Sequence, residues 1–228
     1  MTTETTGTTD GIGGNAFEAA DGAQDWRVLS DGATAFFATP SFTASTRFVA
    51  AIAALSGVDD HAPDVDIRPD GVTVRLLTYA DDWYGMTQRD VELARRISAI
   101  ARDHGLRPDP TVVQSILMIA GAPLPAEVFP FWHAVLGYEA RRDSPEEDLV
   151  DPHGRGVAFW FEQMQEPRGD GGGAIHVGIW VPHDVAEARV EAALAAGGRL
   201  VRDHAPMWWT LADAAGNEAD IGTIKGRD

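Results

Sequence analysis

An internal repeat in the second half of the chain constrains the fold more than any other feature of the sequence. Three pairs of landmark residues are each separated by 62 positions: Gln114 and His176, Asp151 and Asp213, and Gly154 and Gly216. A constant offset over three landmarks is hard to obtain by chance, and a repeat of this kind indicates two copies of one supersecondary unit. We place the copies at about 111–168 and 174–228, joined by the Gly-rich stretch Arg168–Gly173.

Each copy is expected to fold as β-α-β-β-β. In the first copy, apolar runs predict an opening strand over Val112–Ile119 and a last strand over Val157–Phe161. The second copy is predicted to open with a strand over His176–Val181, to continue with a helix over Asp184–Ala196 and to end with a strand over Glu218–Ile224. The two copies therefore account for the second half of the chain.

The first half of the chain has a different pattern, which reads β-β-α-β-β-α. A hairpin is expected over Trp26–Thr39, and a helix follows it. Strands are predicted over Asp64–Ile67 and Val72–Tyr79. A second helix is predicted to open at Thr87, because Asp90 stands three residues later at the spacing of a capping box.

These patterns divide the chain into three segments that together make an α+β protein. Residues 1–22 are rich in Thr and Gly and are expected to be a disordered tail. Residues 23–108 form a first domain and residues 109–228 form the duplicated second domain. Pro108 and Pro110 mark the joint, since two prolines so close together cannot continue a helix.

Charge and composition exclude several classes of function. The formal net charge of −17 argues against nucleic acid and membrane surfaces as partners. The absence of cysteine excludes disulfides and thiolate metal sites. The sequence shows no signal-peptide pattern and no apolar run of about 18 residues. We therefore expect a cytoplasmic protein that acts on a small molecule, and a homo-oligomer is left open.

The first domain resembles the pterin-4a-carbinolamine dehydratase family from Trp26 to about His104. The resemblance rests on Asp60-His61-Ala62-Pro63, on the strand ending Leu77-Thr78-Tyr79, and on Met86-Thr-Gln-Arg-Asp90. The family has a His-His-Pro motif, a Thr-His pair at a strand end, and a Leu-Thr-x-x-Asp motif. Here Ala62 replaces the second histidine and Tyr79 replaces the third, so the frame matches while the catalytic set is partly lost.

This resemblance implies dehydration of a pterin 4a-carbinolamine without a cofactor. The reaction protonates the departing 4a hydroxyl and removes the N5 proton, and an imidazole can do either task near neutral pH. The implied catalytic residues are His61, Tyr79 and Asp90. A tyrosine, with an ordinary pKa of about 10, is better suited to act as an acid than as a base. The implied substrate-binding residues are Asp60, Pro63 and Trp83.

The second domain resembles the vicinal oxygen chelate superfamily, which includes glyoxalase-like and bleomycin-resistance-like proteins, over about Thr111–Ile224. The resemblance rests on Phe131-Trp-His-Ala-Val-Leu-Gly137, on Ile175-His-Val-Gly-Ile-Trp-Val181 and on Asp213-Ala-Ala-Gly-Asn-Glu218. Paired modules of this superfamily form a cupped sheet. Its inward side chains can hold a divalent metal.

The resemblance implies a metal set of Gln114, His176 and Asp220, while Ala158, at the fourth position, supplies no ligand. A metal site needs about three or four converging nitrogen or oxygen ligands. A metal-free pocket is the alternative. Its expected lining is Trp160, Trp180, Glu162 and Glu218.

Three functions follow from these resemblances. The main interpretation is a 4a-hydroxytetrahydrobiopterin dehydratase, a lyase, fused to a glyoxalase-like domain. The first alternative is a non-catalytic binding or scaffold protein, because Ala62, Tyr79 and Ala158 each stand where a functional group is lost. The second alternative is a metal-dependent lyase, isomerase or dioxygenase in the second domain. The fold of that superfamily does not settle its chemistry.

Overall fold

The computed structural model describes residues 11–79, 83–164, 175–212 and 218–227. The chain forms two compact units. The first comprises Met1–Tyr79 and Tyr84–Val113 together with Asp228, and the second comprises Ala80–Trp83 and Gln114–Arg227. No helix in the described part of the chain is long and apolar enough to cross a membrane.

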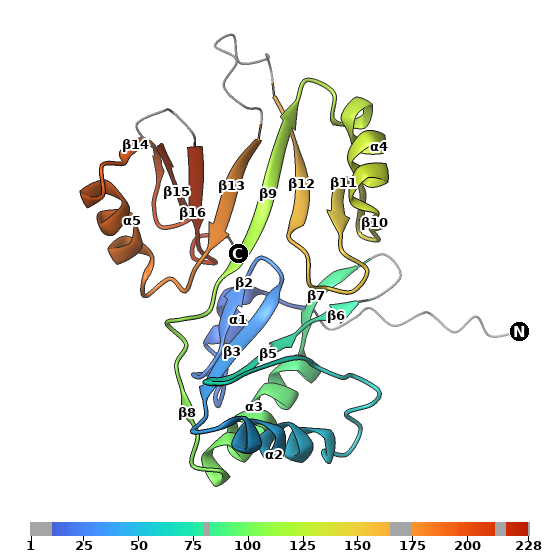
Figure 1. Cartoon of the computed structure of the whole chain (residues 1–228), viewed down its shortest axis with the longest axis vertical. Coiled ribbons are helices and arrows are strands. Elements are labelled where there is room, and N and C mark those ends of the chain that lie inside the picture. Colours follow the sequence, from blue (N-terminus) through green and yellow to red (C-terminus); the bar gives the residue numbers. More distant parts are fainter. Residues whose placement is uncertain (1–10, 80–82, 165–174, 213–217, 228) are drawn as a thin grey trace, which may run out of the picture. The chain divides into compact units, whose positions relative to one another are not determined.

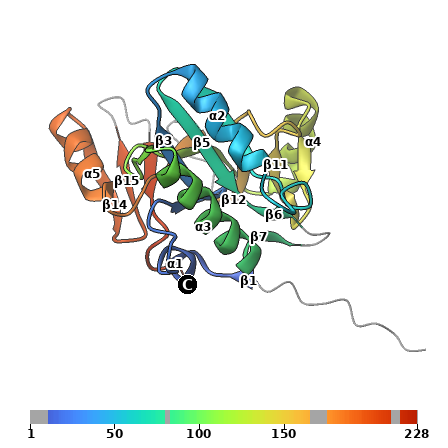
Figure 2. The ribbon, with the colours of Figure 1, turned by 90° about the horizontal axis from the view of Figure 1, so that it is seen from below.

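The first unit carries its strands in two sheets and its two long helices on one of them. Its elements are β1 (Gly11–Ile12), α1 (Gly14–Glu18), β2 (Arg27–Leu29), β3 (Gly32–Ala38), α2 (Phe42–Ala53), β4 (Asp64–Arg68), β5 (Gly71–Leu76), β6 (Thr78–Tyr79), β7 (Tyr84–Thr87), α3 (Gln88–Asp103) and β8 (Arg107–Pro108). The larger sheet has the order β2-β3-β5-β4, with β8 pairing β3, and the smaller one has the order β1-β7-β6. Figure 2 shows α2 and α3 lying over the larger sheet.

The core of the first unit explains where its helices form. In α2, Phe48 and Ile52 are buried one turn apart, and the Ser41 side chain caps the helix by accepting a hydrogen bond from the Ala44 amide. Phe37 on β3 packs edge-on against Phe48. The indole of Trp26 donates to Ser98 on α3 at 3.1 Å, so its buried N–H is satisfied.

The prediction of a disordered tail over 1–22 is wrong for residues 11–22. These residues contain β1 and α1, and the Phe17 side chain on α1 is fully buried. The Glu18 carboxylate accepts a hydrogen bond from the Val28 amide at 3.0 Å, which ties α1 to β2. The Thr- and Gly-rich composition of this segment suggested disorder, but the buried Phe17 side chain anchors it. Residues 1–10 lie outside the described part.

The second unit contains the predicted duplication. Its elements are β9 (Ser115–Ala122), α4 (Pro125–Leu136), β10 (Glu139–Arg141), β11 (Ser144–Val150), β12 (Ala158–Gln163), β13 (Ile175–Trp180), α5 (Ala186–Ala195), β14 (Arg199–His204), β15 (Trp208–Ala212) and β16 (Glu218–Gly222). They form one sheet of order β10-β11-β12-β9-β13-β16-β15-β14 (Figure 1). β9 and β12 are parallel, as are β13 and β16, and β9 meets β13 antiparallel. The predicted α+β class and both β-α-β-β-β modules are confirmed.

One face of this sheet packs against the helices of the two modules. Met118 and Ala120 belong to the apolar cluster beside α4, and Ile179 and Val181 belong to the cluster around α5. Because side chains alternate along a strand, the residues between them point the other way. We call this opposite side the inner face. On the two central strands it carries Ser115, Leu117 and Ile119 from β9 and His176, Gly178 and Trp180 from β13.

The inner face corrects the predicted register of the repeat. Leu117 lies opposite Ala158 in β12, and Gly178 lies opposite Asp220 in β16. Ala158 and Asp220 are therefore equivalent, at the predicted offset of 62. The first strands are offset by 61 instead, so the equivalent of His176 is Ser115. A shift of one residue in a strand moves a side chain to the other face of the sheet.

A glycine in the β2–β3 hairpin provides the first test of the fold. Gly32 has a φ of 120°, and a Cβ at this position would lie 2.5 Å from the Leu76 carbonyl oxygen. We expect Gly32→Ala to lower the free energy of unfolding by about 2 kcal/mol or more in denaturant titrations. Gly57→Ala is the matched control, because Gly57 also has a positive φ but open space around it. It should cost about 1 kcal/mol, and equal losses would contradict the steric argument.

Candidate functional site

The sequence-predicted residues His61 and Asp90 meet in the first unit. His61 lies in the loop between α2 and β4, and Asp90 lies in the first turn of α3. Their side chains are joined at 2.7 Å between His61 Nε2 and Asp90 Oδ1. Asp90 is fully buried, whereas the His61 side chain is 14% exposed. The imidazole therefore has one buried nitrogen held by a carboxylate and reaches the surface of the unit.

Asp90 is held by three further hydrogen bonds, all to Oδ2. The Thr78 hydroxyl donates at 2.7 Å, the Thr87 amide at 2.7 Å and the Thr87 hydroxyl at 2.9 Å. The hydrogen bond from the Thr87 amide is half of the capping box predicted at Thr87 and Asp90. The same carboxylate thus fixes the start of α3 and the orientation of His61.

This geometry fixes the proton on the histidine ring. Every other partner of Asp90 is a donor, so the carboxylate acts as an acceptor throughout. His61 Nε2 then carries a hydrogen and donates it to Asp90. In the neutral ring the lone pair is left on Nδ1, which can accept a proton from a substrate and return it. The arrangement is that of a general acid–base with its orienting carboxylate.

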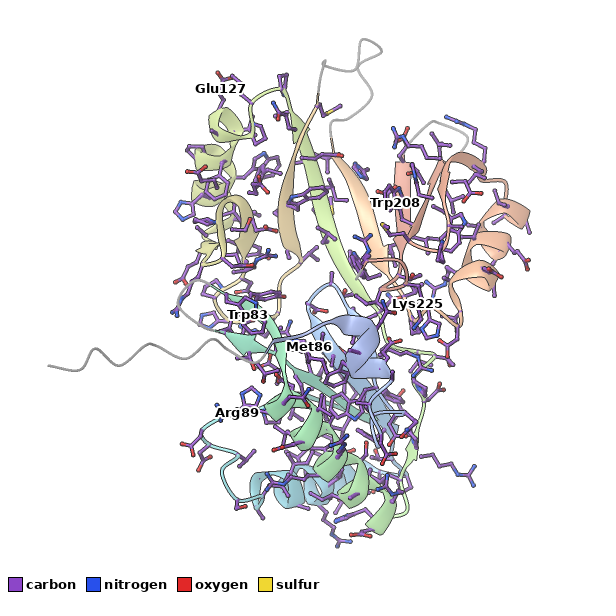
Figure 3. The ribbon with its side chains drawn as sticks, turned by 180° about the vertical axis from the view of Figure 1, so that it is seen from behind. Trp83, Met86, Arg89, Glu127, Trp208 and Lys225 are labelled. Atoms are coloured by element: carbon purple, nitrogen blue, oxygen red, sulfur yellow. The ribbon has the colours of Figure 1, made fainter. Side chains whose placement is uncertain are left out.

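The remaining predicted residues of the first site have varied surroundings. Tyr79 is 58% exposed, and its ring packs edge-on against that of Tyr84 at 5.4 Å. The Asp60 side chain is exposed, and its backbone carbonyl accepts a hydrogen bond from Arg89 on α3 at 3.4 Å. Pro63 is half-buried two residues after His61. Trp83, also half-buried, directly precedes β7; Figure 3 labels it together with Met86 and Arg89.

Thr78 is the site residue that the sequence interpretation missed. Its hydroxyl reaches Asp90, whereas the neighbouring Tyr79 ring packs against Tyr84. The signal was present in the strand-end motif Leu77-Thr78-Tyr79. The comparison with the family motif draws attention to Tyr79, which replaces the family histidine. A buried carboxylate such as that of Asp90 also needs hydrogen-bond donors from its neighbours, and Thr78 is one of them.

In the second unit the structure brings together two of the three residues of the predicted metal set. His176 Nε2 and Asp220 Oδ2 lie 3.3 Å apart on the inner face, from the adjacent strands β13 and β16. Gln114 precedes β9, and its side-chain oxygen instead accepts a hydrogen bond from Arg189 on α5 at 3.4 Å. Gln114 therefore lies on the helix side of the sheet.

The side chains of the predicted metal set, Gln114, His176 and Asp220, do not fit a bound metal ion. His176 and Asp220 are each other's partner, Ala158 has no ligating atom, and Gln114 bonds α5. Among the described residues, no group of three His, Asp or Glu side chains could hold a metal ion. Metal ligation needs about three or four converging donors. No step of a mechanism is therefore assigned to a metal in this unit.

The predicted pocket residues lie on the inner face in successive rows across the sheet. Trp160 lies opposite Ile119, which lies opposite His176. Four residues further along β13, Trp180 lies opposite Gly222. Glu162 and Glu218 have the strand parity of this face as well, and Glu218 contacts Arg202 on β14 at 3.5 Å.

The pairing with His176 makes the stability of the second unit pH-dependent. Burial raises the pKa of Asp220, but the His176 hydrogen bond and the charges of His176 and Arg202 outweigh it, so the net pKa is lowered. A carboxylate with a lowered pKa stabilises the folded state above its unfolded pKa of about 3.9, and this contribution is lost as the pH falls through the folded value. Asp220→Asn should therefore flatten the acid limb of a stability–pH curve below about pH 4. An acid limb that matches the wild type would contradict this assignment.

Comparison with known proteins identifies both units. The family model described as "Pterin 4 alpha carbinolamine dehydratase" matches residues 15–100, and the "Glyoxalase-like domain" model matches residues 117–222. A Roseiflexus sp. (strain RS-1) protein named "Putative pterin-4-alpha-carbinolamine dehydratase" is 42% identical over 64 residues, covering 28% of this chain and 67% of that protein. A Nocardia farcinica protein of the same name is 36% identical over 78 residues, covering 34% of this chain and 80% of that protein.

A solved structure resembles the chain more distantly. A glyoxalase/bleomycin resistance protein/dioxygenase superfamily member from Vibrio splendidus is 18% identical, covering 48% of this chain and 97% of that chain, with a TM-score of 0.31. The family of the first unit follows from the family-model match over residues 15–100. It follows also from the two relatives, of which the chain covers 67% and 80%. The chain belongs to the pterin-4a-carbinolamine dehydratase family through its first unit, to which a glyoxalase-like domain is fused.

Proposed function

We propose that the first unit dehydrates a pterin 4a-carbinolamine and that His61 carries the proton transfer. The observation that carries this proposal is the 2.7 Å bond between His61 Nε2 and the fully buried Asp90. A histidine held in this way has a defined tautomer and a fixed ring plane. The dehydratase names of the relatives support the choice of substrate class.

One imidazole can serve both halves of the reaction. The protonated ring first donates to the 4a hydroxyl, so that the C4a–O bond breaks and water leaves. The neutral ring then removes the N5 proton, and the electrons of the N5–H bond complete the C4a=N5 double bond. The net change is the loss of one water molecule, and the proton returns to His61. The hydroxyl oxygen and N5 are both bonded to C4a, so one ring can act on both.

Asp90 supports both steps without touching the substrate. As the ring gains its proton, the adjacent carboxylate stabilises the positive charge. We therefore propose His61 as the catalytic residue and Asp90 as a positioning residue, with Thr78 and Thr87 orienting the carboxylate. Tyr79, Asp60 and Pro63, which lie in the first unit, are proposed only to border the substrate.

The direct assay follows the decay of a 4a-hydroxytetrahydropterin generated in situ. The wild-type protein should accelerate its conversion to the quinonoid dihydropterin above the rate in buffer. The spontaneous reaction sets the background, so the assay compares initial rates at several protein concentrations. A rate that does not rise with protein concentration would contradict the proposal.

A further inference from the structure

Two tryptophans on the inner face of the second unit flank a glycine. Trp180 on β13 and Trp208 on β15 both lie opposite Gly222 on β16. A Cβ at Gly222 would lie 3.5 Å from the Trp180 ring, so the glycine shares the face with that ring. Gly222 places no side chain between the two indoles. His204 stacks on the ring of Trp208 at 4.3 Å.

Arg227 lies over these rings. Its guanidinium carbon is 4.3 Å from the centre of the Trp180 ring and 5.8 Å from that of the Trp208 ring. A left-handed turn at Gly226, with a φ of 78°, precedes it. Arg227 Nε donates to the Thr223 carbonyl at 2.9 Å, and the Thr223 hydroxyl donates to the Pro206 carbonyl. Cation–π contact and one hydrogen bond therefore hold the guanidinium in place.

Arg227 differs from two partly buried arginines of this acidic chain, because Arg227 itself is exposed. Arg75 pairs with Asp31 and Asp64, and Arg141 pairs with Asp143 and Asp148. Within the described ranges, Arg227 has no carboxylate within salt-bridge distance. The hydrogen bond from Arg227 Nε to the Thr223 carbonyl is the only one that Arg227 makes within these ranges. Nη1 and Nη2 therefore have no partner among the described residues. Partial desolvation of the guanidinium lowers the pKa of Arg227.

We propose that Arg227 is the binding group for the carboxylate of a small planar aromatic acid on the inner face of the second unit. A guanidinium fork binds a carboxylate through two parallel hydrogen bonds, and here its terminal nitrogens have no described partner. The indoles offer stacking surface for the ring. On β9, Leu117 lies on the inner face between this point and Ile119, which is opposite His176. This site is separate from the proposed dehydration and does not depend on it.

Benzoate and benzamide form a matched pair of probes, because they share shape and differ in charge. We expect benzoate to quench the intrinsic tryptophan fluorescence saturably, with a Kd of about 1 mM or below for a ligand of this size. Benzamide should bind about tenfold more weakly or worse, as expected for the loss of charged hydrogen bonds. Equal binding of the two probes, or no saturable response to benzoate, would overturn the proposal.

Variants locate the site. Arg227→Gln should weaken benzoate binding by about tenfold or more, and Arg227→Lys, which keeps the charge but loses the fork, should give an intermediate loss. Lys225→Gln is the matched control, since it removes the same charge two positions away; Figure 3 labels Lys225 and Trp208. It should bind benzoate within about twofold of the wild type. Wild-type affinity in Arg227→Gln, with an unchanged thermal unfolding midpoint, would refute the site. The dehydratase assay on the same variants reports separately on the first unit.

Discussion

Replacing His61 with alanine is expected to lower the catalysed rate of carbinolamine dehydration by about 10²–10⁴-fold, the usual cost of a lost general acid–base. The first unit of this chain offers one imidazole at the motif, because Ala62 and Tyr79 stand at the other two histidine positions. Both proton transfers then fail together. The initial rate of carbinolamine decay, corrected for the spontaneous reaction, measures the effect.

The control for this variant is His153→Ala. His153 is an exposed histidine in the loop after β11, far from the first site in sequence, and its removal deletes the same side chain. Its dehydration rate should equal that of the wild type. If His61→Ala kept the wild-type rate while its unfolding midpoint was unchanged, the catalytic role of His61 would be wrong.

Replacing Asp90 with alanine is expected to give the largest loss of stability in the first unit, about 3–5 kcal/mol. The substitution leaves four donors without their acceptor at a fully buried position: His61 Nε2, the Thr78 hydroxyl, and the amide and hydroxyl of Thr87. It also removes half of the capping box of α3. Denaturant unfolding gives the change in free energy.

Asp90→Asn separates structure from catalysis, because it keeps the shape and one acceptor oxygen. It should cost about 1–3 kcal/mol and still lower the dehydration rate, since an amide does not stabilise a protonated imidazole. Asp66→Ala is the control, because the Asp66 side chain is 53% exposed in a surface ion pair with Arg68. It should cost less than about 1 kcal/mol. A similar loss for Asp66 and Asp90 would contradict the buried network.

The sequence predicted most of the first unit from local patterns. A helix is predicted after the Trp26–Thr39 hairpin, where α2 lies, and the Thr87–Asp90 capping box predicts the start of α3, which begins at Gln88. The segment predicted as one strand over Val72–Tyr79 is divided between β5 and β6. β6 pairs with β7 in a separate sheet. β7 also pairs with β1, and a contact between residues so distant in sequence leaves no local pattern.

The second unit shows how a correct repeat can still misplace a site. The offset of 62 predicted both modules and the equivalence of Ala158 and Asp220, which the strand pairing confirms. It placed Gln114 with His176, but the first strands differ in register by one residue, and this moves Gln114 to the helix side. The Arg227–Trp180 contact depends on a turn at Gly226, and no sequence motif predicts it.

We expect a domain with one remaining motif histidine to be an active dehydratase. The most direct test is the decay rate of 4a-hydroxytetrahydropterin with wild-type, His61→Ala and Arg227→Gln proteins at equal concentration. We predict that the wild type and Arg227→Gln accelerate the decay equally, and that His61→Ala is indistinguishable from buffer. A wild-type rate equal to that in buffer would contradict the account.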